Sequence, residues 1–395
     1  MISKKMVGLV QGSSVIRAMF EEGKALAEKY GAENVYDFSL GNPNVPAPKA
    51  VAEAMIDILT KEDPLYVHGY MSNAGFPEVR KAVAESLNQR FATDFSSDNV
   101  VMTVGAASGL NVIFKTLLDP GDEVITFAPY FGEYRNYVAN YDGRLIEVSP
   151  NTVDFQPKLS ELSEKITEKT KAVLINSPNN PTGVVYSEET LKKMADILEA
   201  KQKEFSSSIY LVTDEPYREL VYGDVEVPFV TKYYRNTIVG YSFSKSLSLP
   251  GERIGYLVIP SKIDDYEDIF AAAGVATRIL GYVNAPSLQQ LTIARCLSES
   301  TDLSYYERNR NELYNGLTGS GFTCQRPDGA FYLFMKTPIE DDVEFCNDAK
   351  KYNILIVPGS TFGCAGYTRI AYCVAYETIV NALPKFRQLA EDYGL

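Results

Sequence analysis

Residues 100–127, VVMTVGAASGLNVIFKTLLDPGDEVITF, contain within a short stretch the pattern that decides the fold. Val100–Val104 is an unbroken apolar run of strand length, and Leu110–Leu118 has the apolar periodicity of a helix. Small residues at Gly105–Gly109 connect the two, and a second apolar run, Glu123–Phe127, follows the helix. A strand, a helix and another strand in this order predict a unit of parallel sheet covered by a helix.

The same alternation continues to about residue 260. Further short apolar runs are expected to form strands, and Glu188–Lys203 has the clearest helical pattern between them. Because buried strands alternate with helices, we expect an α/β fold whose mixed, mostly parallel sheet is covered by helices on both faces. The expected strands are Arg144–Val148, Ala172–Ile175, Ile209–Thr213, Thr237–Tyr241 and Ile254–Ile259.

The character of the sequence changes after about Tyr282. A long, charged helical region, Ser287–Leu317, leads to short expected strands and a C-terminal helix, which predicts a smaller α+β domain completed by the N-terminal segment. We therefore expect residues 1–47 to be the N-terminal part of the small domain, 48–285 the large domain, and 286–395 the small C-terminal domain. The expected strands of the small domain are Phe331–Phe334, Ile354–Val357 and Thr368–Cys373.

The composition excludes several classes of function. The 395 residues include 38 Lys and Arg against 51 Asp and Glu, and the net charge of −13 disfavours nucleic acids and anionic membranes as partners. His68 is the single histidine and lies in no catalytic motif, so neither a histidine-built metal site nor a serine or cysteine triad is expected. Acid–base chemistry must then use Lys, Tyr, Asp, Glu or a cofactor.

The cysteines and the N-terminus predict a cytoplasmic location. The five cysteines have no C-x-x-C spacing, which is usual for free thiols in a reducing compartment. Met1–Val10 lacks the apolar stretch of a secretory signal, and no run of about 20 apolar residues is present to span a membrane. We therefore expect an intracellular protein without a membrane segment.

Two loops that follow expected strands carry groups suited to a phosphate or a phenolate. Gly105–Gly109 opens a helix, where small residues let backbone N–H groups approach a phosphate. In residues 176–183, NSPNNPTG, two prolines fix the backbone and so aim an asparagine side chain at a ligand oxygen. An ordinary strand–helix turn and a structural loop are the alternative interpretations.

Two further loops add charged side chains. Asp214 directly follows the expected strand Ile209–Thr213 and Tyr217 comes three residues later, so a carboxylate and a phenol can reach one ligand. Lys245 follows another strand, lies among serines and precedes Arg253 by eight residues. A lysine near cationic or apolar neighbours has a lowered pKa and can form a Schiff base, while an arginine can neutralise a phosphate. A helix start at Asp214 and a solvated surface lysine are the alternatives.

Together and in this order, these motifs resemble those of the fold-type I pyridoxal-phosphate enzymes, specifically the class I and II aminotransferases of the aspartate aminotransferase superfamily. The resemblance extends from about Ser39 to Arg369. It rests on Asn-Pro-Thr-Gly at 180–183, the Asp-x-x-Tyr pair, and Ser-x-x-Lys followed by the arginine. It implies a pyridoxal-phosphate-dependent transaminase whose large domain binds the cofactor.

The resemblance also implies a role for each matching residue. Lys245 would bind pyridoxal phosphate covalently and then move the substrate proton, and Asp214 would pair with the ring nitrogen. Asn180 and Tyr217 would hydrogen-bond the phenolic oxygen of the ring. The residues expected to hold the phosphate are Gly105, Ala106, Ala107, Ser242, Ser244 and Arg253.

Further matching residues would complete the site. Phe131 matches the aromatic side chain that stacks on the ring, a position often occupied by tryptophan in the family, and this chain has no tryptophan. Arg369 would bind the substrate α-carboxylate with the help of the Gly41 backbone N–H, and Asn180 is expected beside the substrate. Tyr70 matches a tyrosine that reaches the phosphate of the partner subunit, which implies a homodimer with shared sites.

Substrate specificity is the open part of the prediction. We expect transfer between an acidic amino acid, with aspartate favoured, and 2-oxoglutarate by a ping-pong mechanism. The 27 tyrosines keep an aromatic or broad-range aminotransferase open. One bacterial branch of the superfamily binds the distal carboxylate with a lysine, and the matching position here is Ala107. Arg17, Arg135 and His68 are the candidate cations, each with a surface or structural role as the alternative.

Two other hypotheses are a different reaction on the same fold and a protein without catalytic activity. A C–S β-lyase or a decarboxylase would share the cofactor and substrate anchors, so the motifs do not separate them from a transaminase. A non-catalytic ligand-sensing module of the kind fused to DNA-binding domains is disfavoured, because Lys245 is present and no helix-turn-helix precedes the core.

Overall fold

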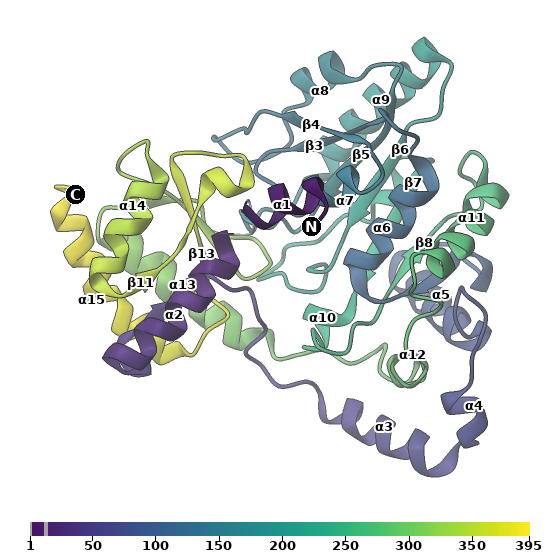
Figure 1. Cartoon of the computed structure of the whole chain (residues 1–395), viewed down its shortest axis with the longest axis horizontal. Coiled ribbons are helices and arrows are strands. Elements are labelled where there is room, and N and C mark those ends of the chain that lie inside the picture. Colours follow the sequence, from purple (N-terminus) through teal and green to yellow (C-terminus); the bar gives the residue numbers. More distant parts are fainter. Residues whose placement is uncertain (1, 12–14) are drawn as a thin grey trace.

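A seven-stranded sheet forms the centre of the larger part of the molecule (Figure 1). The computed structural model describes residues 2–11 and 15–395. The strand order is β2-β8-β7-β6-β5-β3-β4, in which β8 runs antiparallel to both of its neighbours and all other pairs are parallel. This order confirms the predicted mixed, mostly parallel sheet. Its strands are β2 (Val100–Thr103), β3 (Glu123–Phe127), β4 (Arg144–Val148), β5 (Thr170–Asn176), β6 (Tyr210–Asp214), β7 (Thr237–Ser242) and β8 (Gly255–Val258).

Helices cover both faces of this sheet, because alternate residues of its strands point to opposite sides. In β5, Ala172 and Leu174 pack with α6, α7 and α11, whereas Val173 and Ile175 pack with α8 and α9. All four side chains are at most 1% exposed, so the sheet is buried on both faces. These helices are α6 (Gly105–Leu117), α7 (Tyr134–Ala139), α8 (Leu159–Lys165), α9 (Glu188–Phe205) and α11 (Tyr266–Ile279).

A third group of helices packs at the edge of the sheet formed by β2 and β8. Their apolar side chains share one hydrophobic cluster with Val100 and Met102 of β2 and with Val258 of β8. Pro77 opens one of these helices, because its fixed φ suits the first helical turn. The helices are α3 (Lys49–Lys61), α4 (Pro64–His68), α5 (Pro77–Phe91) and α12 (Ser287–Ala294).

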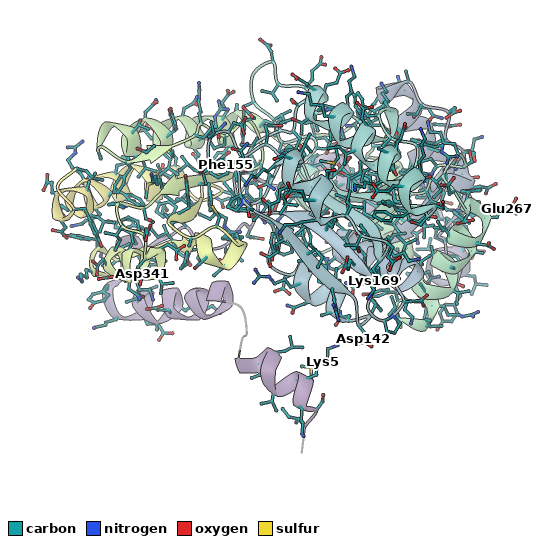
Figure 2. All side chains as sticks on the ribbon, turned by 90° about the horizontal axis from the view of Figure 1, so that it is seen from above. Lys5, Asp142, Phe155, Lys169, Glu267 and Asp341 are labelled. Atoms are coloured by element: carbon teal, nitrogen blue, oxygen red, sulfur yellow. The ribbon has the colours of Figure 1, made fainter. Side chains whose placement is uncertain are left out.

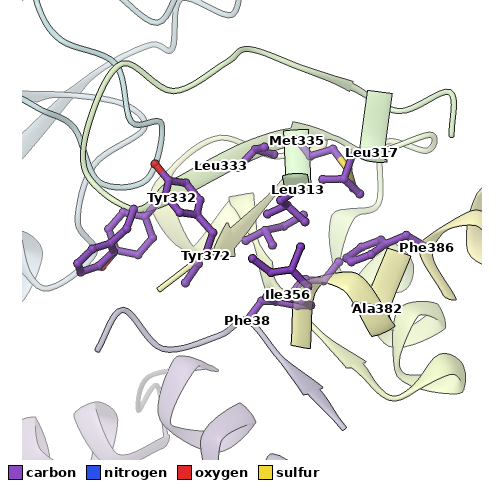
Figure 3. Packing of buried hydrophobic residues seen from close by; sticks show 14 of the residues in the cluster. Phe38, Leu313, Leu317, Tyr332, Leu333, Met335, Ile356, Tyr372, Ala382 and Phe386 are labelled. Carbon is purple, nitrogen blue, oxygen red and sulfur yellow. The ribbon is translucent and has the colours of Figure 1, made fainter. Parts of the chain in front are cut away.

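Residues near both ends of the chain build the smaller part of the molecule. β1 (Tyr36–Asp37) pairs in parallel with β11 (Ile354–Leu355). An antiparallel sheet of order β12-β13-β10-β9 packs with α13, α14 and α15 around one hydrophobic cluster (Figure 3). The bounds are β9 (Thr323–Cys324), β10 (Tyr332–Lys336), β12 (Val357–Pro358), β13 (Tyr367–Ala371), α13 (Leu303–Gly319), α14 (Asp342–Ala349) and α15 (Tyr376–Asp392).

Two helices precede β1, namely α1 (Lys4–Gln11) and α2 (Val15–Tyr30). Figure 2 shows α1 standing apart from the main body, and its Lys5 ammonium donates to the Ala139 carbonyl at 2.7 Å. Within residues 2–11 and 15–395, no helix combines the length and the apolar character needed to cross a bilayer. Short 3-10 turns occur at Ala32–Asn34, Ser97–Asn99, Val230–Lys232, Lys350–Tyr352 and Gly359–Phe362.

The expected helical region Ser287–Leu317 is divided into two helices. α12 ends at Ala294 and α13 begins at Leu303. The Asp302 side chain accepts a hydrogen bond from the Ser304 backbone N–H at 2.9 Å, which caps the start of the second helix. The expected strand Ile354–Val357 is also divided, because its first two residues pair with β1 and Val357 pairs with β13.

Candidate active site

The sequence motifs converge at the carboxyl ends of the parallel strands. Asp214 ends β6, Ser242 ends β7, and Asn180 follows β5. Ligands bind at this edge in open α/β sheets, where the loops after neighbouring strands meet. These residues line a cavity of about 280 Å³.

Nearly all of the predicted site residues border this one cavity. Gly105 adjoins it as the first residue of α6, whereas Tyr70 is 93% exposed and is not part of the lining. The predicted residues that line the cavity are Gly41, Ala106, Ala107, Phe131, Asn180, Asp214, Tyr217, Ser242, Ser244, Lys245, Arg253 and Arg369.

Asp214 is a buried carboxyl group with one oxygen free to bind a ligand. The Tyr134 hydroxyl donates to its Oδ2 at 2.6 Å, and Asn176 Nδ2 donates to its backbone carbonyl at 2.7 Å. Its Oδ1 is buried and has no hydrogen-bond partner within residues 2–11 and 15–395. Burial raises the pKa of Asp214 from 3.8 to about 7, against the hydrogen bond from Tyr134, which lowers it. A buried acceptor of this kind fits a protonated ring nitrogen.

Lys245 presents an amine whose charge is easily lost. It lies on the short helix α10 (Phe243–Ser246), where its Nζ donates to the Gly41 carbonyl at 2.8 Å. Burial lowers the pKa of the Lys245 ammonium from 10.5 to about 8, opposed by the Cys373 thiol and assisted by the charge of Arg253. A usable fraction of neutral amine is therefore present near neutral pH.

The N-terminus of α6, two serines and an arginine form an anion-binding end of the cavity. The first turn of α6 carries no acidic side chain, so its dipole and free N–H groups favour an anion. The hydroxyl oxygens of Ser242 and Ser244 lie 2.7 Å apart. Gly105 has a φ of +78°, and a Cβ there would lie 2.7 Å from Arg253 Nη2, so glycine keeps this corner open.

Arg369 is a buried guanidinium on β13, only 2% exposed. Nη1 donates to Asn180 Oδ1 at 3.1 Å, and Nη2 donates to the Ser39 carbonyl at 2.6 Å. The group lies over the rings of Tyr332 and Phe362, 4.6 and 4.8 Å from their centres. Its Nε has no hydrogen-bond partner in the described part of the chain. A rigid cation with an unused donor suits a carboxylate.

Tyr217 and Phe131 supply two rings to the lining. The Tyr217 hydroxyl lies 3.0 Å from the Tyr332 hydroxyl, and burial raises the pKa of Tyr217 well above 10, so it stays a neutral donor. Phe131 meets Tyr134 edge to face, with ring centres 5.7 Å apart. The face of such a ring can stack on a flat ligand.

The structure does not bring Arg135 or His68 into the cavity. The Arg135 guanidinium donates to the Tyr130 hydroxyl and pairs with Glu147 at 3.0 Å. His68 is exposed at the end of α4. The side chain of Arg17, on α2, lies outside the described residues. The cations in the described lining are Lys245, Arg253 and Arg369.

Four polar residues of the described lining were not predicted, namely Tyr134, Tyr137, Asn176 and Tyr332. The Asn176 side chain joins two site loops, because its Oδ1 accepts from the Asn180 N–H at 2.7 Å while its Nδ2 donates to the Asp214 carbonyl. A signal for Asn176 was present, since it is the first residue of NSPNNPTG. The three tyrosines carried no such signal, because Tyr332 lies in an apolar run typical of a core strand and the other two lie on the helix α7.

Comparison with known proteins identifies the family. A family model described as aminotransferase class I and II matches residues 33–386. The chain belongs to the class I and II aminotransferases. An aspartate aminotransferase from Thermotoga maritima is 33% identical over 368 residues, which is 92% of this chain and 93% of that relative.

Two solved structures have the same fold as this class I and II aminotransferase over nearly the whole chain. An amino transferase from Eubacterium rectale has a TM-score of 0.97 and 48% identity, with 100% of both chains covered. The aspartate aminotransferase from Thermus thermophilus with maleate has a TM-score of 0.87 and 29% identity, covering 98% of this chain and 99% of that one. The mixed α/β fold is therefore that of the aspartate aminotransferases.

Membership of the family makes the protein a pyridoxal-phosphate-dependent transaminase. The residues present fit this cofactor. The unpaired Asp214 Oδ1 matches its ring nitrogen, and the corner kept open at Gly105 beside Arg253 matches its phosphate. The buried amine of Lys245, whose pKa is lowered to about 8, also fits a cofactor that binds through an amine.

Proposed function

We propose that this aminotransferase moves the α-amino group between an L-amino acid, with acidic donors and especially aspartate favoured, and 2-oxoglutarate by a ping-pong mechanism. The observation that carries the proposal is a single cavity lined by Lys245, Asp214 and Arg369. These residues offer an amine, an unpaired buried carboxylate oxygen and a buried guanidinium. One cavity suits a ping-pong reaction, because the amino acid and the 2-oxo acid carry the same α-carboxylate for the same arginine.

The chain's own residues would hold the cofactor from several sides. When bound, pyridoxal phosphate supplies an electron sink for charge that develops on the substrate α-carbon. Asp214 would keep the ring nitrogen protonated, Asn180 and Tyr217 would donate to the phenolic oxygen, and Phe131 would stack on the ring. The phosphate would be held by Gly105, Ala106, Ala107, Ser242, Ser244 and Arg253.

Lys245 would carry the proton that the reaction moves. Its Nζ would bind the cofactor before substrate arrives, and the freed amine would then take the proton from the substrate α-carbon and give it to the C4′ carbon of the cofactor. A pKa of about 8 lets the amine exist in both forms near neutral pH. The Gly41 carbonyl, 2.8 Å from Nζ, orients the amine.

An acidic donor is supported by the relatives. The Thermotoga maritima relative is an aspartate aminotransferase, and the Thermus thermophilus structure contains maleate, a dicarboxylate. Arg369 would bind the α-carboxylate, so a second cation is needed for the distal one. Arg17 on α2 is the candidate we propose to test first, because Arg135 and His68 do not line the cavity.

An aromatic or broad-range donor is the second candidate, and the lining of the cavity favours it. Phe131, Tyr137 and Tyr332 surround the cavity with rings. An aromatic side chain of a substrate needs no second cation and packs well against such rings.

A panel of amino donors with 2-oxoglutarate separates these candidates. We expect kcat/KM to be highest for aspartate, and Arg17→Ala to lower it by about ten-fold or more for aspartate but not for alanine. Arg135→Ala is the matched control and should change kcat/KM neither for aspartate nor for alanine. Higher kcat/KM for phenylalanine than for aspartate would favour the second candidate. Release of pyruvate, ammonia or carbon dioxide without an oxo-acid acceptor would indicate a β-lyase or a decarboxylase and contradict transamination.

A homodimer with shared active sites is part of the proposal. Large apolar side chains are exposed on α3 and α4, with Ile56 63% and Leu65 83% exposed, and Tyr70 follows them. A group of exposed apolar residues marks an interaction surface. In the dimer, Tyr70 would reach the phosphate in the partner's site. We also propose a cytoplasmic location, which the five free cysteines support.

A further inference from the structure

Tyr332 links the cofactor side of the cavity to the substrate side. This residue lies on β10, is only 3% exposed and lines the cavity. Its hydroxyl lies 3.0 Å from the Tyr217 hydroxyl, and the two rings meet edge to face with centres 5.8 Å apart. In Figure 3, the Tyr332 oxygen points away from the packed side chains of Leu313 and Met335. The hydroxyl is therefore directed out of the hydrophobic cluster.

Contacts on two sides confine the Tyr332 ring. β10 and β13 are neighbours, and their register puts Tyr332 diagonally across from Arg369, whose guanidinium lies 4.6 Å from the ring centre. A Cβ at Gly41 would collide with the Tyr332 hydroxyl. The Tyr332 ring can occupy this position only because residue 41 is glycine. The Arg369 guanidinium packs against the face of the ring.

In the hydrogen bond between the two hydroxyls, either Tyr217 or Tyr332 can be the donor. Burial raises the pKa of Tyr217 well above 10 and that of Tyr332 to about 12, so each phenol keeps its proton at neutral pH. If Tyr332 donates to Tyr217, the proton of Tyr217 stays available for another acceptor. A hydroxyl that accepts a hydrogen bond also becomes a better donor, because linked hydrogen bonds polarise one another.

We propose that Tyr332 is a positioning residue, whose hydroxyl donates to Tyr217 and so aims and strengthens the hydrogen bond that Tyr217 gives to the phenolic oxygen of the cofactor. This inference rests on the role of Tyr217 in the proposed function. Charged and titratable groups from other elements also surround the pair and are kept unchanged in the test, namely Asp214, Lys245, Arg369 and Cys373.

The absorption spectrum of the pyridoxal-phosphate-loaded protein, titrated with pH, measures this hydrogen bond without an activity assay. A donor to the phenolic oxygen stabilises the form that has lost its proton, so its removal raises the midpoint of the spectral change. We expect Tyr217→Phe to raise the midpoint most and Tyr332→Phe to raise it by about half a pH unit. The double variant should shift no further than Tyr217→Phe alone, because Tyr332 acts through Tyr217.

Tyr372→Phe is the matched control. Tyr372 is buried in the same cluster, and its hydroxyl lies 3.4 Å from that of Tyr222, outside the cavity lining (Figure 3). Its loss should leave the midpoint unchanged. Tyr332→Phe should also leave the KM for the amino donor within about two-fold of wild type, because the ring over Arg369 is kept.

The outcomes separate this inference from the proposed function. A Tyr332→Phe midpoint equal to that of Tyr372→Phe, while Tyr217→Phe shifts, overturns the role of Tyr332 and leaves the proposed function standing. An unchanged midpoint in Tyr217→Phe overturns the assignment of Tyr217 and the inference with it. If Tyr332→Phe does not fold, Gly41→Ala keeps both hydroxyls but displaces the ring. Its midpoint should then rise, and an unchanged value overturns the inference.

Discussion

Two single atoms show that the cavity is built to receive a ligand. Asp214 Oδ1 and Arg369 Nε are both buried, and neither has a hydrogen-bond partner in the described part of the chain. Leaving such a group unsatisfied costs about 1–3 kcal/mol. The cofactor would pair with Asp214 Oδ1 and a carboxylate substrate with Arg369, and each would remove part of this cost. We therefore expect each of the two ligands to stabilise the fold.

Asp214→Asn should change how the stability of the cofactor-free protein depends on pH. The folded-state pKa of Asp214, about 7, lies above the reference value of 3.8, so the folded state binds more protons between these values. The free energy of unfolding therefore falls as pH rises from about 4 to about 7, by up to about 4 kcal/mol. Asparagine cannot ionise and removes this contribution. Urea unfolding of both proteins across this range measures it, and identical pH profiles would contradict an uncompensated buried carboxyl group.

Arg369→Lys should raise the KM for the amino donor by about ten-fold or more. A lysine cannot form a bidentate pair with a carboxylate, nor keep the hydrogen bonds to both Asn180 and Ser39. Steady-state kinetics give the KM, and equilibrium dialysis should show a much smaller change in cofactor affinity. Arg326→Lys, at an exposed arginine that bonds Asn311, is the control. An unchanged KM would remove Arg369 from the substrate site.

The sequence alone pointed to residues of the cavity lining where the residue type was unusual for its place. Asp214 and Lys245 stand out at the ends of apolar strands, and Asn180 stands out between prolines. Tyr332 could not be found in this way, because it lies in an aromatic and apolar run that is typical of a core strand. Only the placement of β10 beside β13 brings its hydroxyl to the cavity. Tyr134 was missed because it begins a helix between Glu133 and Arg135, where nothing in the sequence marks a site.

Among the elements, α6 depends most on the identity of a single residue, the glycine at its N-terminus. It follows β2 after a single residue, Val104, and begins with Gly105 at a φ of +78°. The turn thereby leaves free N–H groups beside Arg253. This is the geometry in which a helix binds a phosphate.

Gly105→Ala should raise the dissociation constant of pyridoxal phosphate by about ten-fold or more, because the new Cβ would displace Arg253. Gly121→Ala is the matched control, since Gly121 also has a positive φ, +92°, but its Cβ would meet nothing within 4 Å. Both variants carry similar backbone strain of about 1 kcal/mol. Fluorescence titration with the cofactor compares them. Equal affinities in the two variants would mean that the corner at Gly105 does not hold the phosphate.

Elements were predicted best where burial is greatest. All strands of the seven-stranded sheet except the edge strand β4 are buried on both faces, so they appear in the sequence as largely apolar runs. The region Ser287–Leu317 was predicted less well, because its helical periodicity continues across the break that Asp302 caps. Ile354–Val357 looks like one strand, and its division between two sheets depends on β1, far away in the sequence.

At the scale of the whole molecule, the cavity is built from segments that are far apart in the chain. Gly41 comes from near the N-terminus and Arg369 from near the C-terminus, whereas Asp214 ends β6 and Lys245 lies on α10, directly after β7. We propose the domain boundaries 1–47, 48–285 and 286–395, because the pairing of β1 with β11 joins the first segment to the third. The helix α12, at the start of the third segment, packs against the large domain. The net charge of −13 is a property of the whole chain. Within this acidic molecule, Arg253 and Arg369 place positive charge at the cavity.

Subunit mixing tests whether Tyr70 serves the partner's site. Tyr70→Ala and Lys245→Ala homodimers should each have strongly reduced activity. After mixing and exchange of subunits, a mixed dimer has one site with an intact Lys245 and with Tyr70 from the other chain, so activity should return. Light scattering verifies the dimer mass. No recovery in mixtures that contain mixed dimers would contradict shared sites.

The most direct test of the central claim locates the cofactor on the chain. The protein loaded with pyridoxal phosphate is reduced with borohydride, digested and mapped by mass spectrometry. We predict the pyridoxyl mass on Lys245, one per chain, and no stable label on the Lys245→Ala protein. A label on another lysine in the wild-type protein, or none, would contradict the account.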